Sequence, residues 1–195
     1  MRKEVFYLKK CIIFLALLLC SCSAPKKQNE IKKETQTREV TRKITVQEIT
    51  IAEATTNVID KGENRVNNIL LACQKISGMK LAPGEEFSFN KITGRKTSKN
   101  GYKTAPVIVD GEKSHGIGGG VCQVSTTVFM AVKSGGFEIT EHHNHSESVA
   151  YAPDGMDATV VYGFKDFRFI NNTEDNIYIY TWAENGKVYA KIVKK

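Results

Sequence analysis

One cysteine of the chain stands directly after a run of glycines. In GIGGGVCQVSTT (residues 116–127), a single valine separates Gly118, Gly119 and Gly120 from Cys122. Adjacent glycines carry a large backbone-entropy cost, so such a run indicates a sharp bend or a close approach to the backbone. A thiolate at this place has the chemistry of a nucleophile that attacks an acyl group, with backbone N–H groups holding the oxyanion.

A cysteine nucleophile needs a base, and the histidines of the chain stand on either side of it. They are His115, His142, His143 and His145, the last three within EHHNHS. If His143 and His145 are both extended, their side chains point to the same side, so one could serve Cys122 while the other orients or binds. A carboxylate would fix the imidazole. Asp157 and Asp166 are both candidates, and spacing alone does not choose between them.

Three other interpretations of these residues stay open. The histidines could bind zinc, but one thiol without a second closely spaced ligand pair makes a poor site, so we expect no metal and no cofactor. Cys73 and Cys122 could form a disulfide in an exported protein, although access for a substrate better explains a cysteine after a glycine loop. The glycines could also be a simple tight turn into a helix.

Two helices are predicted from the spacing of apolar residues. Those of CQVSTTVFMAVKS (residues 122–134) share one face, which predicts a helix with Cys122 at its N-terminus. Unsatisfied N–H groups and the helix dipole favour a thiolate there, and the N–H of Cys122 or Gln123 would help to hold an oxyanion. ENRVNNILLACQKISG (residues 63–78) predicts the second helix, with Cys73 as a buried apolar residue.

The remaining structured segments predict strands. Residues 81–90 predict a Pro-Gly turn into a strand, and residues 104–113 a strand that runs into an Asp-Gly turn. The other strands are predicted at residues 44–52, 148–152, 158–164, 166–172, 176–183 and 187–194. The last two are joined by Glu184-Asn185-Gly186-Lys187, a strong signal for a two-residue hairpin turn. We therefore predict one α+β domain, residues 44–195, with two main helices packed on a largely antiparallel sheet.

The first residues have the pattern of an export signal. Four basic residues precede an apolar run, Cys11 to Leu19, that is too short to span a bilayer comfortably. Leu19-Cys20-Ser21-Cys22 resembles a bacterial lipobox, which predicts a signal peptide of residues 1–21 and a lipid on Cys22. An uncleaved anchor and a plain secretory peptide are the alternatives, and all three place the domain outside the cytoplasm.

Residues 22–43 are polar and charged, and they predict a flexible tether because they cannot bury enough apolar surface to fold. The formal net charge of the chain is +7. Much of the surplus lies in the leader and the tether, so the charge does not argue for nucleic acid. No feature of the sequence indicates a protein partner.

Several motifs, in their order and spacing, resemble those of the VanW family of exported bacterial proteins. They are GEEFSFNKITG, GYKTAPVIVDGE, GIGGGVCQVSTT, EHHNHS, YAPDGMDATVVYG and DFRFINNT. The similarity runs from Arg65 to Ile179. The family is named after an accessory component of some glycopeptide-resistance clusters, and the resemblance implies an L,D-transpeptidase that joins peptidoglycan stem peptides by 3-3 cross-links.

The resemblance also implies roles for single residues. Cys122 would be the nucleophile that forms a thioester with the donor stem, and His143 or His145 the base. Gly118 to Gly120, Gln123 and Ser125 would shape the site. Asp157 and Arg168 complete the expected substrate-binding residues.

The chain departs from the family pattern at three positions. His142 stands where arginine is expected, Ser148 where proline is common, and Met156 where arginine usually precedes Asp157. Two cations near the site are therefore missing, and Arg168 or Lys165 would have to hold the carboxylates of the stem peptide.

Two other functions stay open beside a membrane-anchored transpeptidase of the cell envelope. The same nucleophile could pass the thioester to water, as a cysteine peptidase or carboxypeptidase does. Alternatively, a non-catalytic accessory lipoprotein could use the glycine loop only to recognise peptide ends of peptidoglycan.

Overall fold

A computed structural model describes residues 47–109 and 112–195. The predicted signal peptide (1–21), the tether (22–43) and Cys22 lie outside the described residues and stay predictions, as does a domain start at residue 44. In the described part of the chain, no helix is both long and apolar enough to cross a membrane.

The structure confirms the α+β class. The helices are α2 (Glu63–Ile76), α3 (Phe89–Thr93) and α4 (Val121–Ser134), with a short 3-10 turn at Ser98–Asn100. The strands are β1 (Ile49–Asn57), β2 (Met79–Leu81), β3 (Glu86–Ser88), β4 (Thr104–Val109), β5 (Glu112–Ile117), β6 (Glu138–Glu141), β7 (Arg168–Ile170), β8 (Ile177–Glu184) and β9 (Lys187–Lys194).

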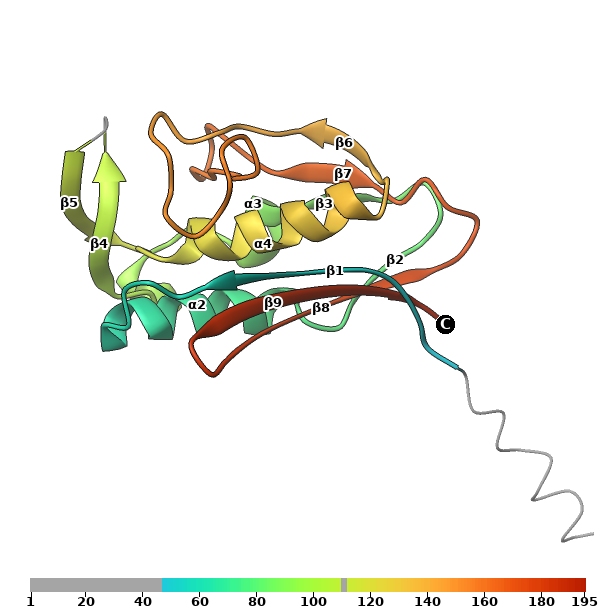
Figure 1. Cartoon of the computed structure of the whole chain (residues 1–195), viewed down its shortest axis with the longest axis horizontal. Helices are drawn as coiled ribbons and strands as arrows, with labels where there is room; N and C mark the ends of the chain where they lie inside the picture. Colours follow the sequence, from blue (N-terminus) through green and yellow to red (C-terminus); the bar gives the residue numbers. More distant parts are fainter. Residues whose placement is uncertain (1–46, 110–111) are drawn as a thin grey trace, which may run out of the picture. The chain divides into compact units, whose positions relative to one another are not determined.

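The strands form three antiparallel sheets. Their orders are β1-β9-β8-β2, β3-β7-β6 and β4-β5. In Figure 1, α4 runs between the four-stranded and the three-stranded sheet, and the β4-β5 hairpin stands near the first turn of α4. The predicted hairpin between β8 and β9 is confirmed, since Glu184 pairs with Lys187 and both turn residues, Asn185 and Gly186, have positive φ.

The core explains why α4 lies where it does. The predicted apolar face of α4 is fully buried. It consists of Val124, Val128, Ala131 and Val132. Cys73 is buried on α2, and burial raises the pKa of its thiol to about 12. Cys73 and Cys122 are both free, so the alternative of a disulfide between them is wrong.

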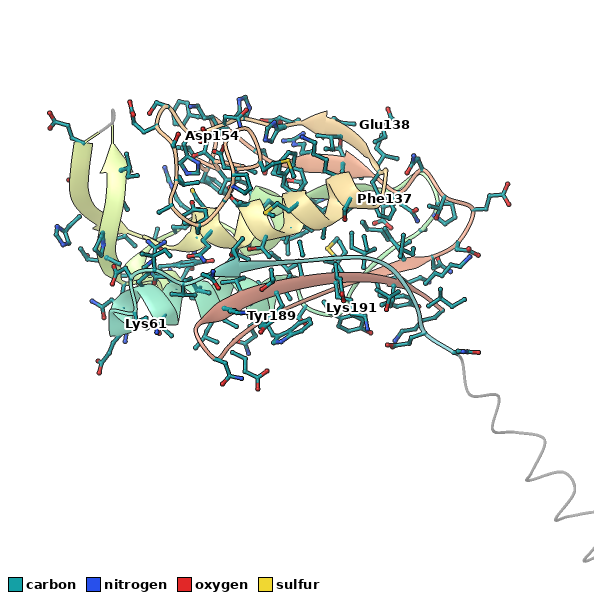
Figure 2. The ribbon with its side chains drawn as sticks, viewed as in Figure 1. Lys61, Phe137, Glu138, Asp154, Tyr189 and Lys191 are labelled. Carbon is teal, nitrogen blue, oxygen red and sulfur yellow. The ribbon has the colours of Figure 1, made fainter. Side chains whose placement is uncertain are left out.

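Two predicted strands are wrong. Residues 148–152 form turns, and residues 158–164 contribute only an isolated bridge between Val161 and Lys165. Their apolar alternation suits a strand, but the backbone N–H groups bind elsewhere: that of Ala158 donates to the hydroxyl of Thr126 and that of Thr159 to the carbonyl of His143. These residues belong to the long loop between β6 and β7, and Figure 2 shows Asp154 of this loop over the N-terminal half of α4.

Candidate active site

Cys122 is the second residue of α4. Its half-buried Sγ lies 3.8 Å from the hydroxyl of Thr159 and 3.7 Å from the carbonyl oxygen of Val160. The N–H of Gln123 donates to the carbonyl of Gly120. Among the described residues, no backbone acceptor binds the N–H of Cys122. Of the two predicted oxyanion donors, the backbone N–H of Cys122 is therefore the available one.

Other parts of the protein pack so closely against the three glycines before Cys122 that a side chain at any of these positions would not fit. A Cβ on Gly118 would lie 2.9 Å from Cβ of Lys96, one on Gly119 would lie 2.5 Å from the carbonyl oxygen of Pro106, and one on Gly120 would lie 2.9 Å from Cγ of Arg65. Gly118 and Gly120 also have φ of +93° and +103°. Protein atoms, rather than open space for a substrate, therefore lie against the run.

His145 is held by a buried carboxylate. Its Nδ1 lies 2.6 Å from Oδ2 of Asp157, and its backbone N–H donates to the same oxygen at 2.7 Å. Asn144 donates from its amide to the other carboxylate oxygen at 2.8 Å. Because Asp157 engages Nδ1, the other ring nitrogen, Nε2, is left for Cys122, and the thiol and the imidazole shift each other's pKa.

The pKa values of the three groups shift in the directions of a thiolate–imidazolium pair. Burial raises the pKa of the Cys122 thiol, but the imidazole of His145 and its charge lower it further, so that it ends below its usual range. Burial lowers the pKa of His145, but Cys122 and Asp157 together raise it above its usual value. The pKa of Asp157 is lowered, because its hydrogen bonds outweigh the effect of burial.

The neighbouring histidines have other partners. His143 lies 3.0 Å from Oε1 of Glu141 and is 37% exposed. His142 binds the carbonyl of Asp157 at 2.7 Å and stacks on Phe129 with ring centroids 4.1 Å apart. The structure therefore brings His145, and not His143, to Cys122. In the described part of the chain, no cluster of three or more His, Cys, Asp or Glu side chains is arranged to hold a metal ion.

Gln123 and Ser125 lie under the site rather than in it. Both are fully buried. The Gln123 amide donates to the hydroxyl of Thr56 and to the carbonyl of Asn57. Ser125 donates to the carbonyl of Ala158 at 2.6 Å. These bonds fix α4 against β1 and against the segment that carries Asp157 and Thr159, so the two side chains position the site.

Arg168 lies in a different group of charges. It forms ion pairs with Asp166 at 3.0 Å, Glu141 at 3.2 Å and Glu86 at 3.8 Å. Asp166 in turn accepts from Ser88 and from the backbone of Asn90, and so it is not the partner of His145. Asp166 and Glu141 border a groove of about 470 Å³ that Lys165 and Arg168 also line. The structure thus does not bring Arg168 to Cys122.

The sequence did not indicate several residues that the structure places around Cys122. Thr159 and Tyr151 lie in the segments that were predicted as strands. The pKa of the partly buried phenol of Tyr151 is raised mainly by desolvation, and the charge of Cys122 raises it further. Arg65 and Lys96 come from α2 and from the segment after α3. Only the three tightly packed glycines signalled that other elements must approach here.

Comparisons with known proteins agree with the motifs. The family model described as VanW like protein matches residues 64–193. The chain is 47% identical over 117 residues to YoaR of Bacillus subtilis (strain 168), described as an uncharacterized protein, and the match covers 60% of this chain and 39% of YoaR. It is 27% identical over 135 residues to the vancomycin B-type resistance protein VanW of Enterococcus faecalis (strain ATCC 700802 / V583), covering 67% of this chain and 49% of that protein.

The chain thus spans less than half the length of either relative. No solved structure gives a significant match.

Proposed function

Because the chain belongs to the family of VanW-like proteins, we propose that it is a cell-wall enzyme, a cysteine L,D-transpeptidase that acts on peptidoglycan stem peptides. The observation that carries the proposal is the arrangement of Cys122, His145 and Asp157 at the N-terminus of α4. A relative's name, vancomycin B-type resistance protein, supports a cell-wall context.

The first half of the reaction forms a thioester. The thiolate of Cys122 attacks the carbonyl carbon of the third residue of a tetrapeptide stem, and the backbone N–H of Cys122 stabilises the oxyanion. The His145 imidazolium then gives its proton to the leaving amine, so that the peptide bond breaks and D-alanine departs. Asp157 keeps the imidazole in the required tautomer and orientation.

The second half transfers the acyl group. The amine of an acceptor stem attacks the thioester carbonyl and loses a proton to neutral His145. The C–S bond breaks, the thiolate of Cys122 returns, and a 3-3 cross-link remains. Water in place of the amine would give a tripeptide instead, which is the reaction of a carboxypeptidase.

We propose further that the domain works outside the cytoplasm, anchored to a bacterial membrane by a lipid on Cys22. The sequence Leu19-Cys20-Ser21-Cys22 supports this proposal. Labelling of cells with a palmitate analogue should mark the wild-type chain and fail to mark Cys22→Ala, whereas equal labelling of both would contradict the anchor.

The function is tested by the products that the full-length protein forms in detergent from disaccharide-tetrapeptide muropeptides. Mass spectrometry should detect 3-3 linked dimers with wild-type protein and with Cys73→Ala, a control that removes the buried thiol, but not with Cys122→Ala. Tripeptides without dimers would instead identify a hydrolase. Unchanged muropeptides would contradict both enzymes and favour a binding protein.

A further inference from the structure

Two basic side chains lie on either side of the turn that leads to Cys122. Arg65 of α2 lies against Gly120, whose added Cβ would be 2.9 Å from Cγ of Arg65. Lys96 lies against Gly118, whose added Cβ would be 2.9 and 3.0 Å from Cβ and Cγ of Lys96. The glycine run therefore lets the aliphatic parts of two basic side chains, from two different segments of the chain, pack against the turn that leads to Cys122.

Neither cation forms an ion pair within the described residues. Arg65 donates from Nη2 to the neutral amide of Gln123 at 3.3 Å. Its Nε is buried and has no hydrogen-bond partner. An unpaired buried donor of a charged group is costly, because the group has lost its water and gained nothing in return.

Lys96 is in a similar state. Its ammonium donates to Asn90 at 2.8 Å and to Thr93 at 3.2 Å, both of them neutral side chains. Burial lowers its pKa to about 8, and the charges of Cys122 and Asp166 partly oppose this. Arg168, by contrast, is matched by three carboxylates. Among the described residues, Arg65 and Lys96 thus have no carboxylate at ion-pair distance.

The place of these cations indicates which anion would neutralise them. In a peptide that loses its last residue, the terminal carboxylate belongs to the leaving residue, whose Cα lies about 3.8 Å from that of the residue under attack. This carboxylate therefore travels with the scissile bond to the nucleophile. A carboxylate elsewhere on a long substrate would lie far from the scissile bond and would not meet cations at the glycine turn.

We propose that Arg65 and Lys96 form the subsite for the C-terminal carboxylate of the peptide acyl donor, so that the protein selects peptide ends over internal peptide bonds. This inference rests on the proposed function and names how that site selects its donor.

The test measures binding, so that it stays separate from turnover. Isothermal titration of full-length Cys122→Ala protein at pH 7 would compare a disaccharide-tetrapeptide muropeptide that has a free terminal carboxylate with the same compound amidated at that end. We expect the acid to bind about tenfold more tightly, the ratio typical of a lost charged hydrogen bond. Arg65→Gln and Lys96→Met should each weaken binding of the acid towards that of the amide. Lys99→Met, which removes an exposed lysine nearby, should leave the preference intact.

Equal binding of acid and amide would overturn the subsite, as would variants that weaken both ligands equally, because that is the result of a merely structural role. If Arg65→Gln does not fold, the comparison of the acid with the amide, in Cys122→Ala and in its Lys96→Met variant, still tests the subsite. A carboxylate preference in a protein that forms no thioester would support the subsite while contradicting the transpeptidase. Thioester formation without the preference would do the reverse.

Discussion

Oδ2 of Asp157 accepts two hydrogen bonds from the same residue, one from Nδ1 of His145 at 2.6 Å and one from its backbone N–H at 2.7 Å. The side chain and the main chain of His145 are thus fixed by one oxygen. Ser125 and Thr126 of α4 bind Ala158, the residue directly after Asp157, so the imidazole is held relative to the helix that carries Cys122.

The first prediction concerns the reactivity of Cys122. The rate at which iodoacetamide alkylates Cys122 should rise with pH. The midpoint of this rise should lie at a lower pH than for an ordinary thiol. In His145→Ala the midpoint should move upward past the ordinary value, because burial, which raises the pKa, is then less opposed. The rate is followed by mass spectrometry between pH 5 and 10, a range chosen to span the usual thiol pKa of about 8.5.

His143→Ala is the matched control, since His143 pairs with Glu141 instead. A midpoint that shifts equally in both histidine variants would contradict the assignment of His145. Cys73 should not interfere, because its pKa is about 12.

The second prediction concerns Asp157 and pH. The folded state lowers the pKa of Asp157, so the ionised carboxylate stabilises the protein above the unfolded pKa of about 3.9, and this contribution is lost as the pH falls through the folded value. Asp157→Asn should therefore lower the free energy of unfolding at pH 7 by about 1–3 kcal/mol.

Urea unfolding at pH 7 and at pH 3 measures the difference between wild type and Asp157→Asn. The difference should shrink at the lower pH. A difference that stays constant would show that the carboxylate charge contributes nothing to stability.

The third prediction concerns Gly119. An alanine Cβ would lie 2.5 Å from the carbonyl oxygen of Pro106 and 2.9 Å from Ala105, both backbone contacts that cannot rotate away. Gly119→Ala should destabilise the fold by about 3 kcal/mol or more, as severe overpacking does. Thermal unfolding followed by circular dichroism provides the measurement.

Gly155→Ala serves as its control. Gly155 has φ +70° but nothing within 4 Å of an added Cβ, so that variant should cost only about 1–2 kcal/mol of backbone strain. If both variants lost the same free energy of unfolding, the close contacts at Gly119 would not contribute to the destabilisation.

The parts of the fold that could be predicted are those in which local pattern and tertiary packing agree. The face of α4 shows the helical period because it packs against β1 and β9, and the Asn185-Gly186 turn follows from its own φ requirements. Residues 148–152 and 158–164 alternate apolar and polar residues as a strand does, but they form a loop. Buried residues such as Val149 and Val160 pack this loop onto the core, and its backbone binds side chains of α4 instead of a neighbouring strand.

Cys122 could be singled out as a candidate nucleophile because only Val121 separates it from the glycine run. The choice of His145 over His143 depends on the loop that brings Asp157 back to EHHNHS, which no spacing rule contains. Arg65 and Lys96 could not be found from the sequence for the same reason: only the packing of α2 and of the segment after α3 places them against the glycines.

The most direct test of the central claim is the intact mass of the full-length protein, quenched in acid shortly after mixing with a disaccharide-tetrapeptide. The account predicts an adduct on Cys122 whose mass equals that of the muropeptide less D-alanine, seen in the wild type and in His143→Ala but absent from Cys122→Ala. An unmodified protein at every mixing time, together with an unchanged muropeptide, would contradict it.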